Sequence, residues 1–149
     1  MTFEWKLVVD AADPHAQVEF WAAALGYEIE DNSALIERLL GFGAVSVDET
    51  VERWGRRAFS DLVAVRHPDD AVDEQTGAGL GRRILFQRVP EPKGGKNRLH
   101  IDIHAGGERR DAEAERLVGL GASVTRFVQT PGGQWLLMAD PEGNEFCLQ

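Results

Sequence analysis

The sequence predicts an α+β fold built from two copies of a βαβββ module, and three observations lead to this prediction. A strand–helix–strand pattern occurs near the start of the chain and again in its last third. The helix-ending glycines, Gly26 and Gly121, follow their first strands at nearly the same distance, as two copies of one unit would require. A Pro/Gly/Lys-rich linker at residues 90–97 separates the two patterns. The prediction is a single domain with module one at about 1–90 and module two at about 98–149.

Module one begins with an apolar, β-branched strand at residues 3–9. Asp13 then supplies a helix N-cap, and Pro14 occupies the first helical position. Apolar residues follow at helical spacing as far as Gly26, which suits a left-handed C-cap. The other three strands of this module are expected at residues 27–30, 62–65 and 84–89.

Residues 32–57 form an insertion that makes module one the longer of the two. Apolar residues at helical spacing predict one helix near its start, and Ser46 with Glu49 has the spacing of a capping box that opens a second short helix towards Trp54. The insertion is either a packing appendage or a lid over a pocket, because long additions to small domains are often functional. The acidic, glycine-rich residues 69–81 are expected to form a mobile loop.

Module two repeats the pattern from residue 98 onwards. Residues 98–104 alternate between apolar and polar, which is typical of a half-buried strand, and a helix follows at about 108–120. Residues 140–144, Asp-Pro-Glu-Gly-Asn, form a tight turn by composition. The remaining strands are expected at residues 123–128, 135–139 and 145–149.

Charge and cysteine content exclude several classes of partner. The 25 acidic residues exceed the 16 basic ones and give a formal net charge of −9, which disfavours binding to nucleic acid or to an anionic membrane surface. The single cysteine favours a reducing compartment. The start of the chain lacks the pattern of a signal peptide, and no run of 18 apolar residues occurs. We therefore expect a cytoplasmic protein without a membrane segment.

Three segments carry a resemblance to a known family. They read DPHAQVEFWAAALGYEI, NRLHIDIH and WLLMADPEGNEFCL. Together they resemble the glyoxalase/bleomycin resistance/dioxygenase superfamily, also called the vicinal oxygen chelate superfamily, and in particular its glyoxalase-like subgroup. The resemblance covers nearly the whole chain. It implies two modules whose curled mixed sheet surrounds a cavity, with helices on the outer face, and it implies pairing into a homodimer.

In metal-dependent members of that superfamily, four side chains on the first and last strand of each module hold a divalent ion. Transferred to this chain, the positions fall on Lys6, a residue near Gln87, His100 and Cys147. A lysine ammonium at the first position adds positive charge and no lone pair, so it repels a cation. We therefore expect no cofactor. The alternative is a divalent metal bound by another set of side chains, namely His100, Asp102, Glu145 and Cys147.

Strand alternation separates cavity-facing from core-facing residues. It directs Trp5 and Leu99 towards the core and the polar residues that follow them, Lys6 and His100, towards the cavity. We predict His100 as the catalytic acid/base and Lys6 as an electrostatic anchor, although either could instead have only a structural role. His15 is expected at the surface. The predicted ligand-binding residues are Gln87, Asp102, Cys147, Trp54, Trp135 and Phe86.

Three functions are compatible with these residues. The first is a protein that binds a small organic molecule in the cavity, with metal-independent catalysis as an option. The second is a metal-dependent lyase, isomerase or dioxygenase, and the third is a resistance protein that sequesters an antibiotic. Because one fold hosts many chemistries, the resemblance does not choose among them, and whether the protein is an enzyme stays open.

Overall fold

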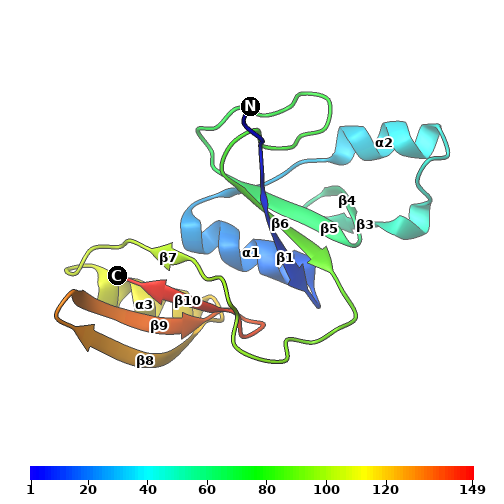
Figure 1. The fold of residues 1–149 in the computed structure, drawn as a ribbon. Coiled ribbons are helices and arrows are strands. Elements are labelled where there is room, and N and C mark those ends of the chain that lie inside the picture. The colour runs from blue at the N-terminus through cyan, green and yellow to red at the C-terminus, as the bar shows by residue number, and fades with distance from the viewer.

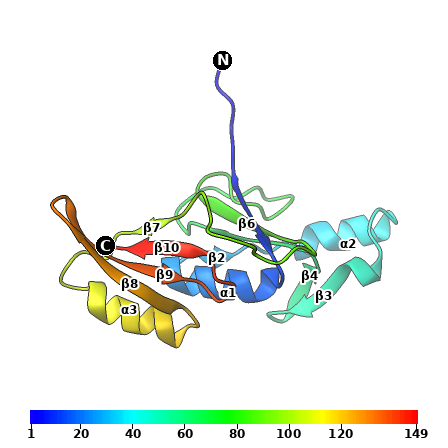
Figure 2. The same ribbon diagram turned by 60° about the horizontal axis from the view of Figure 1, so that its bottom comes forward.

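Two separate four-stranded sheets form the framework of the computed structural model, which describes all 149 residues (Figures 1 and 2). The first sheet contains, in spatial order, β1 (Leu7–Ala11), β6 (Arg83–Arg88), β5 (Leu62–Arg66) and β2 (Glu28–Ile29). The second contains β7 (Asp102–Ile103), β10 (Glu145–Leu148), β9 (Gly133–Ala139) and β8 (Ser123–Thr130). In each sheet the module's first strand in the sequence pairs in parallel with its last, β1 with β6 and β7 with β10. The other neighbouring strands are antiparallel. This shared order confirms the α+β class, and the sheets do not close into a barrel.

The helices begin and end largely where local signals predict. The Asp13 carboxylate accepts hydrogen bonds from the first-turn N–H groups of α1 (Pro14–Leu25), and Gly26 ends that helix at φ 67°. α2 (Ser33–Gly41) lies in the insertion, and α3 (Arg110–Gly119) belongs to the second module. None of these helices combines the length and hydrophobicity needed to cross a membrane.

The hydrophobic core is shared by the two modules. Phe20 and Trp21 of α1 pack against Phe146 of β10, with ring centroids 6.2 and 5.4 Å apart, respectively. The Trp21 Nε1–H also donates to the Asp140 carboxylate at 3.1 Å, and both residues are buried. Side chains from both sheets complete one continuous cluster, so the modules are packed as a single unit.

Part of the insertion differs from the sequence prediction. The capping box of Ser46 and Glu49 is present, but it opens only the 3₁₀ turn η1 (Val47–Glu49). The chain then forms a hairpin of β3 (Thr50–Arg53) and β4 (Arg56–Phe59), so the second helix predicted towards Trp54 is wrong. Trp54 and Gly55 both have positive φ, 53° and 72°, as a two-residue hairpin turn requires.

The first strand of each module is shorter than the alternation suggested. β1 starts at Leu7 because its pairing with β6 begins only at the Leu7–Ile84 pair, and Trp5 is 86% exposed. Leu99 is 78% exposed, since β7 begins only at Asp102. The core-facing positions predicted for Trp5 and Leu99 are therefore wrong. Figure 2 shows the N-terminal segment projecting away from the body of the protein.

The loop at residues 69–81 makes specific contacts, although the sequence suggested a mobile segment. The Gly79 N–H donates to the buried Glu30 carboxylate at 2.8 Å. Gly77 has a φ of 76° and lies so close to Asp31 that an added Cβ would stand 1.8 Å from the Asp31 carbonyl oxygen. The loop is therefore fastened to the end of β2, beside the first sheet.

Candidate functional site

Of the two main pockets, the larger lies on the face of the second sheet that is turned away from the core. Phe146 and Leu148 point into the core, so Cys147 between them points to the opposite face. There it meets side chains from β7, β8 and β9 and from the preceding loop. The pocket has a volume of about 340 Å³, which is within the range of small-molecule sites.

His100 and Asp102 lie side by side in this pocket. The His100 Nε2 atom lies 3.3 Å from Asp102 Oδ1, and the Gln149 side-chain amide donates to Asp102 Oδ2 at 3.0 Å. Both members of the pair remain about two-fifths exposed, with side-chain exposures of 42% and 40%. When Nε2 carries the proton directed at Asp102, Nδ1 keeps a lone pair that can accept a proton. The arrangement is suited to acid–base chemistry.

Cys147 is a buried thiol beside the same carboxylate. Burial raises its pKa, and the negative charge and hydrogen bond of Asp102 raise it further against the smaller opposing effect of Lys96. The thiol therefore stays protonated at neutral pH and is a weak nucleophile.

Glu145 lies at the rim of the pocket with its charge already balanced. Partial burial acts to raise its pKa, but the Asn97 N–H and the Lys93 ammonium outweigh this effect and hold the pKa below its usual value. The Asn97 N–H donates to Glu145 Oε2 at 3.0 Å, and the Lys93 ammonium donates to Oε1 at 3.1 Å. Glu145 thus fixes the loop before β7 instead of presenting a free carboxylate to the pocket.

The second, smaller pocket lies on the first sheet and has a volume of about 190 Å³. Lys6, Asn32 and Leu62 line it, together with the ion pair between Glu30 and Arg83. Lys6 and His100 are therefore in different pockets within one chain. Gln87, at the end of β6, is exposed and lines neither of the two.

Three of the six predicted ligand-binding residues line the larger pocket, and the other three, Gln87, Phe86 and Trp54, lie elsewhere. Asp102, Cys147 and Trp135 are in the pocket wall. Phe86 is completely buried in the core, because it pairs with Val9 and faces α1, so its predicted place in a pocket wall is wrong.

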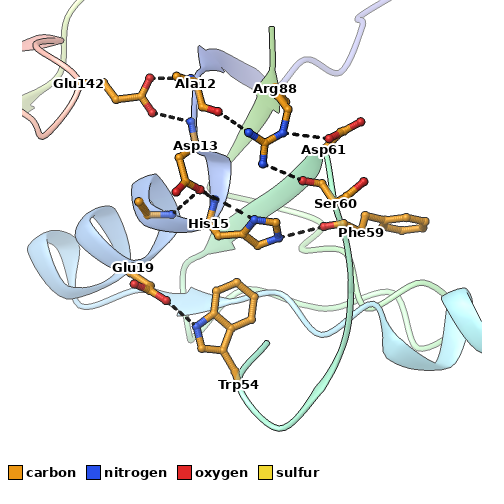
Figure 3. Close-up of polar contacts among 11 residues, drawn as sticks. Ala12, Asp13, His15, Glu19, Trp54, Phe59, Ser60, Asp61, Arg88 and Glu142 are labelled. Atoms are coloured by element: carbon orange, nitrogen blue, oxygen red, sulfur yellow. Dashed lines mark hydrogen bonds and ion pairs between the residues drawn. The ribbon is translucent and has the colours of Figure 1, made fainter. Parts of the chain in front are cut away.

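Trp54 also lies outside these two pockets. It sits at the hairpin tip, where its Nε1–H donates to Glu19 of α1 at 3.0 Å and its ring lies 5.8 Å from that of His15 (Figure 3). His15 is only 4% exposed and shares a 3.0 Å hydrogen bond between Nε2 and the Phe59 carbonyl, so its expected surface position is wrong. Trp54 therefore attaches the insertion to α1, and the hairpin packs on the outside of module one.

The turn at residues 140–144 connects the modules near the start of α1. The Glu142 carboxylate accepts hydrogen bonds from the Ala12 and Asp13 N–H groups at 2.6 and 3.0 Å (Figure 3). These N–H groups precede the helix and have no partner within it, so a carboxylate is well placed there. This turn, which lies in the third segment of the resemblance, thus holds the two modules together.

The sequence analysis missed both cationic residues of the pocket. Lys96 lies in the linker, and Arg126 lies on β8 opposite Leu137. Alternation along residues 123–128 could have placed Arg126 on the same face as Val128, but a register shift between Val124 and Arg126 obscures the pattern.

The larger pocket also contains three potential metal ligands. One donor atom each from His100, Asp102 and Cys147 lies within 4.8 Å of the others. An imidazole nitrogen, a carboxylate oxygen and a thiolate sulfur suit a borderline ion such as Zn²⁺. The four-position set implied by the resemblance does not fit within one chain, because Lys6 is cationic and lies in the other pocket.

Solved structures show that the fold is a known one. A point mutant of the fosfomycin resistance protein FosX from Listeria monocytogenes, complexed with Mn(II) and 1S,2S-dihydroxypropylphosphonic acid, is similar with a TM-score of 0.59 at 12% identity, over 100% of this chain and 90% of that one. A glyoxalase/bleomycin resistance protein/dioxygenase family enzyme from Burkholderia phytofirmans has a TM-score of 0.57 at 15% identity, with coverages of 96% and 94%. The bleomycin-binding protein of Streptomyces verticillus, complexed with copper(II)-bleomycin, has a TM-score of 0.50 at 18% identity, with coverages of 100% and 98%.

Sequence comparison identifies the family. No curated protein matches the chain significantly. The sequence model of the glyoxalase-like domain, in contrast, matches residues 6–149. The chain therefore belongs to the glyoxalase-like domain family, within the vicinal oxygen chelate superfamily.

Proposed function

We propose that this protein binds a small organic molecule in the larger pocket, with His100 as the acid/base group. The observation that supports this most strongly is the His100–Asp102 pair in a pocket of about 340 Å³. The pair lies beside the apolar side chains of Trp135, Leu137 and Val128. An apolar wall with a few converging polar groups is the usual composition of a ligand site.

A thermal-shift screen of small organic molecules against a pocket-filling variant tests this proposal. A ligand that binds only the folded state increases the free energy of unfolding, by about 2.7 kcal/mol at a hundredfold excess over Kd. The midpoint temperature of unfolding therefore rises. Val128→Trp places a large ring in the pocket and should abolish the shift. Val124→Trp is the matched control, because Val124 is on the same strand, 47% exposed and outside the pocket. Equal shifts in both variants would contradict the assignment.

We further propose that the protein works as a homodimer. Lys6 and His100 occupy separate pockets, and β1 and β7 are edge strands with unpaired backbone groups. A two-fold pair could bring the Lys6 pocket of one protomer to the His100 pocket of its partner, which would restore the predicted role of Lys6 as an anchor. Light scattering should give twice the chain mass of 16.5 kDa, and a mass of 16.5 kDa across a concentration series would contradict the dimer.

Metal-dependent chemistry is the second candidate function, favoured by the cluster of His100, Asp102 and Cys147. These side chains would hold the ion, and it would supply Lewis-acid polarisation of an oxygen. Elemental analysis after dialysis separates the two candidates: stoichiometric divalent metal, lost in Cys147→Ser, would favour this one over the metal-independent site.

A further inference from the structure

The basic residues of this acidic protein are unevenly paired. Most of the 16 lysines and arginines form ion pairs with carboxylates, as expected in a chain with 25 acids. Arg126 is one of the seven that make no ion pair, and it makes no hydrogen bond either. Lys96 donates only to the carbonyl of the next residue, Asn97, at 3.2 Å. Both of these cations line the larger pocket.

The acids of the same pocket are already engaged. Asp102 accepts from Gln149 and contacts His100, and Glu145 accepts from Lys93 and the Asn97 N–H. Lys93 balances the charge of Glu145, whereas the side-chain amide of Gln149 does not cancel that of Asp102. Lys96 and Arg126 therefore face one carboxylate without a lysine or arginine partner, which leaves a small positive surplus in the pocket while the chain as a whole carries −9. Such a local inversion of charge attracts anions selectively.

The part of the pocket wall that β8 and β9 supply is largely apolar. Trp135, Leu137 and Val128 line it, and the indole of Trp135 is partly buried. A flat or aliphatic molecular body gains from burial against such side chains, whereas a small inorganic anion does not.

From this pattern we propose that the pocket takes an organic anion, with its carboxylate or phosphonate group at Lys96 and Arg126 and its apolar body against Trp135. The proposal rests on the larger pocket being the ligand site, as proposed above. Arg126 can bind either head group through two parallel hydrogen bonds, and Lys96 adds a point charge. The bound anion lies beside His100, where a proton can be exchanged with it.

Matched probes separate the charge from the apolar body. Phenylacetate, phenylphosphonate and the neutral phenylacetamide share a ring, and binding of each is followed by the NMR signal of the Trp135 indole N–H, assigned with Trp135→Phe. At least one anion should bind about tenfold or more tightly than the amide, and its affinity should fall as sodium chloride is raised. The tighter anion identifies the preferred head group.

Charge-neutralising variants locate the anion. Arg126→Gln and Lys96→Gln should each weaken binding of the anion by about fivefold or more and leave the amide unaffected. Arg53→Gln is the matched control, because Arg53 is an exposed arginine without an ion pair and lies in the hairpin, outside the pocket. Circular dichroism confirms that each variant is folded.

The outcomes distinguish this inference from the proposed function. If the amide binds as tightly as the anions and shifts the Trp135 signal, the anion preference is wrong while the pocket assignment stands. If Arg53→Gln weakens anion binding as much as Arg126→Gln, the effect is one of net charge and the inference is wrong. If the anions bind with no change at Trp135, the pocket assignment and the inference both fail.

Discussion

Replacing Glu30 by alanine should lower the free energy of unfolding by about 3–5 kcal/mol, because it leaves a buried charge without its partner. The Glu30 side chain is 1% exposed and accepts two hydrogen bonds from Arg83, each 2.7 Å long. It also accepts the Gly79 N–H at 2.8 Å, so the loss would release the loop at residues 69–81 from β2 as well. Urea-induced unfolding followed by circular dichroism measures the change.

Glu28→Ala is the matched control for this variant. Glu28 lies two residues earlier and pairs with Arg66, but its side chain is 55% exposed. Exposed pairs contribute about 0–1 kcal/mol, so this variant should remain close to the wild type. The double variant Glu30→Met/Arg83→Met should recover much of the lost stability, since it removes both charges. A Glu30→Ala protein as stable as Glu28→Ala would contradict the role assigned to the buried pair.

Replacing Phe146 by alanine should cost about 3–5 kcal/mol of stability and should affect both modules together. The ring is completely buried and contacts Phe20 and Trp21 of the other module. Its removal therefore opens a cavity at the place where the two modules meet. Thermal unfolding followed by tryptophan fluorescence and by circular dichroism gives the midpoint and tests whether both probes report one transition.

Phe127→Ala provides the comparison for Phe146. Phe127 is on β8 and is 49% exposed, with the Arg110 guanidinium 5.2 Å from its ring centroid. Its loss should cost less than half as much as that of Phe146, because little buried volume is removed. Two separate transitions in the Phe146→Ala protein would mean that the modules are only loosely coupled. One transition at a lower temperature is the expected result.

Local signals predicted the fold well where they act within a few residues. The Asp13 cap, the Gly26 stop and the Ser46–Glu49 box are all present, and the predicted repeat of the element order is found in the two sheets. Strand ends were predicted less well, because a strand extends only as far as its neighbour does. Trp5 follows the alternation of β1, yet β6 offers it no partner, and the residue is exposed.

The candidate pocket was predicted in part, because local alternation places residues on a sheet face but does not place one sheet against another. His100, Asp102 and Cys147 meet because alternation on adjacent strands fixes one face, and β7 pairs Asp102 directly with Cys147. Lys6 precedes β1 and lines the pocket on the other sheet, and the relative positions of separate sheets depend on packing that no local pattern encodes. The buried position of His15 likewise depends on Phe59 and Trp54 of the β3–β4 hairpin, which the sequence did not reveal.

The most direct test of the ligand site is a map of backbone amide chemical shifts during titration with an organic ligand obtained from the thermal-shift screen. The largest changes should fall on the second sheet, around Asp102, Trp135 and Cys147, and they should vanish in Val128→Trp. Changes centred instead on Lys6, Leu62 and Leu85 would place the ligand in the smaller pocket of the first sheet and contradict the assignment.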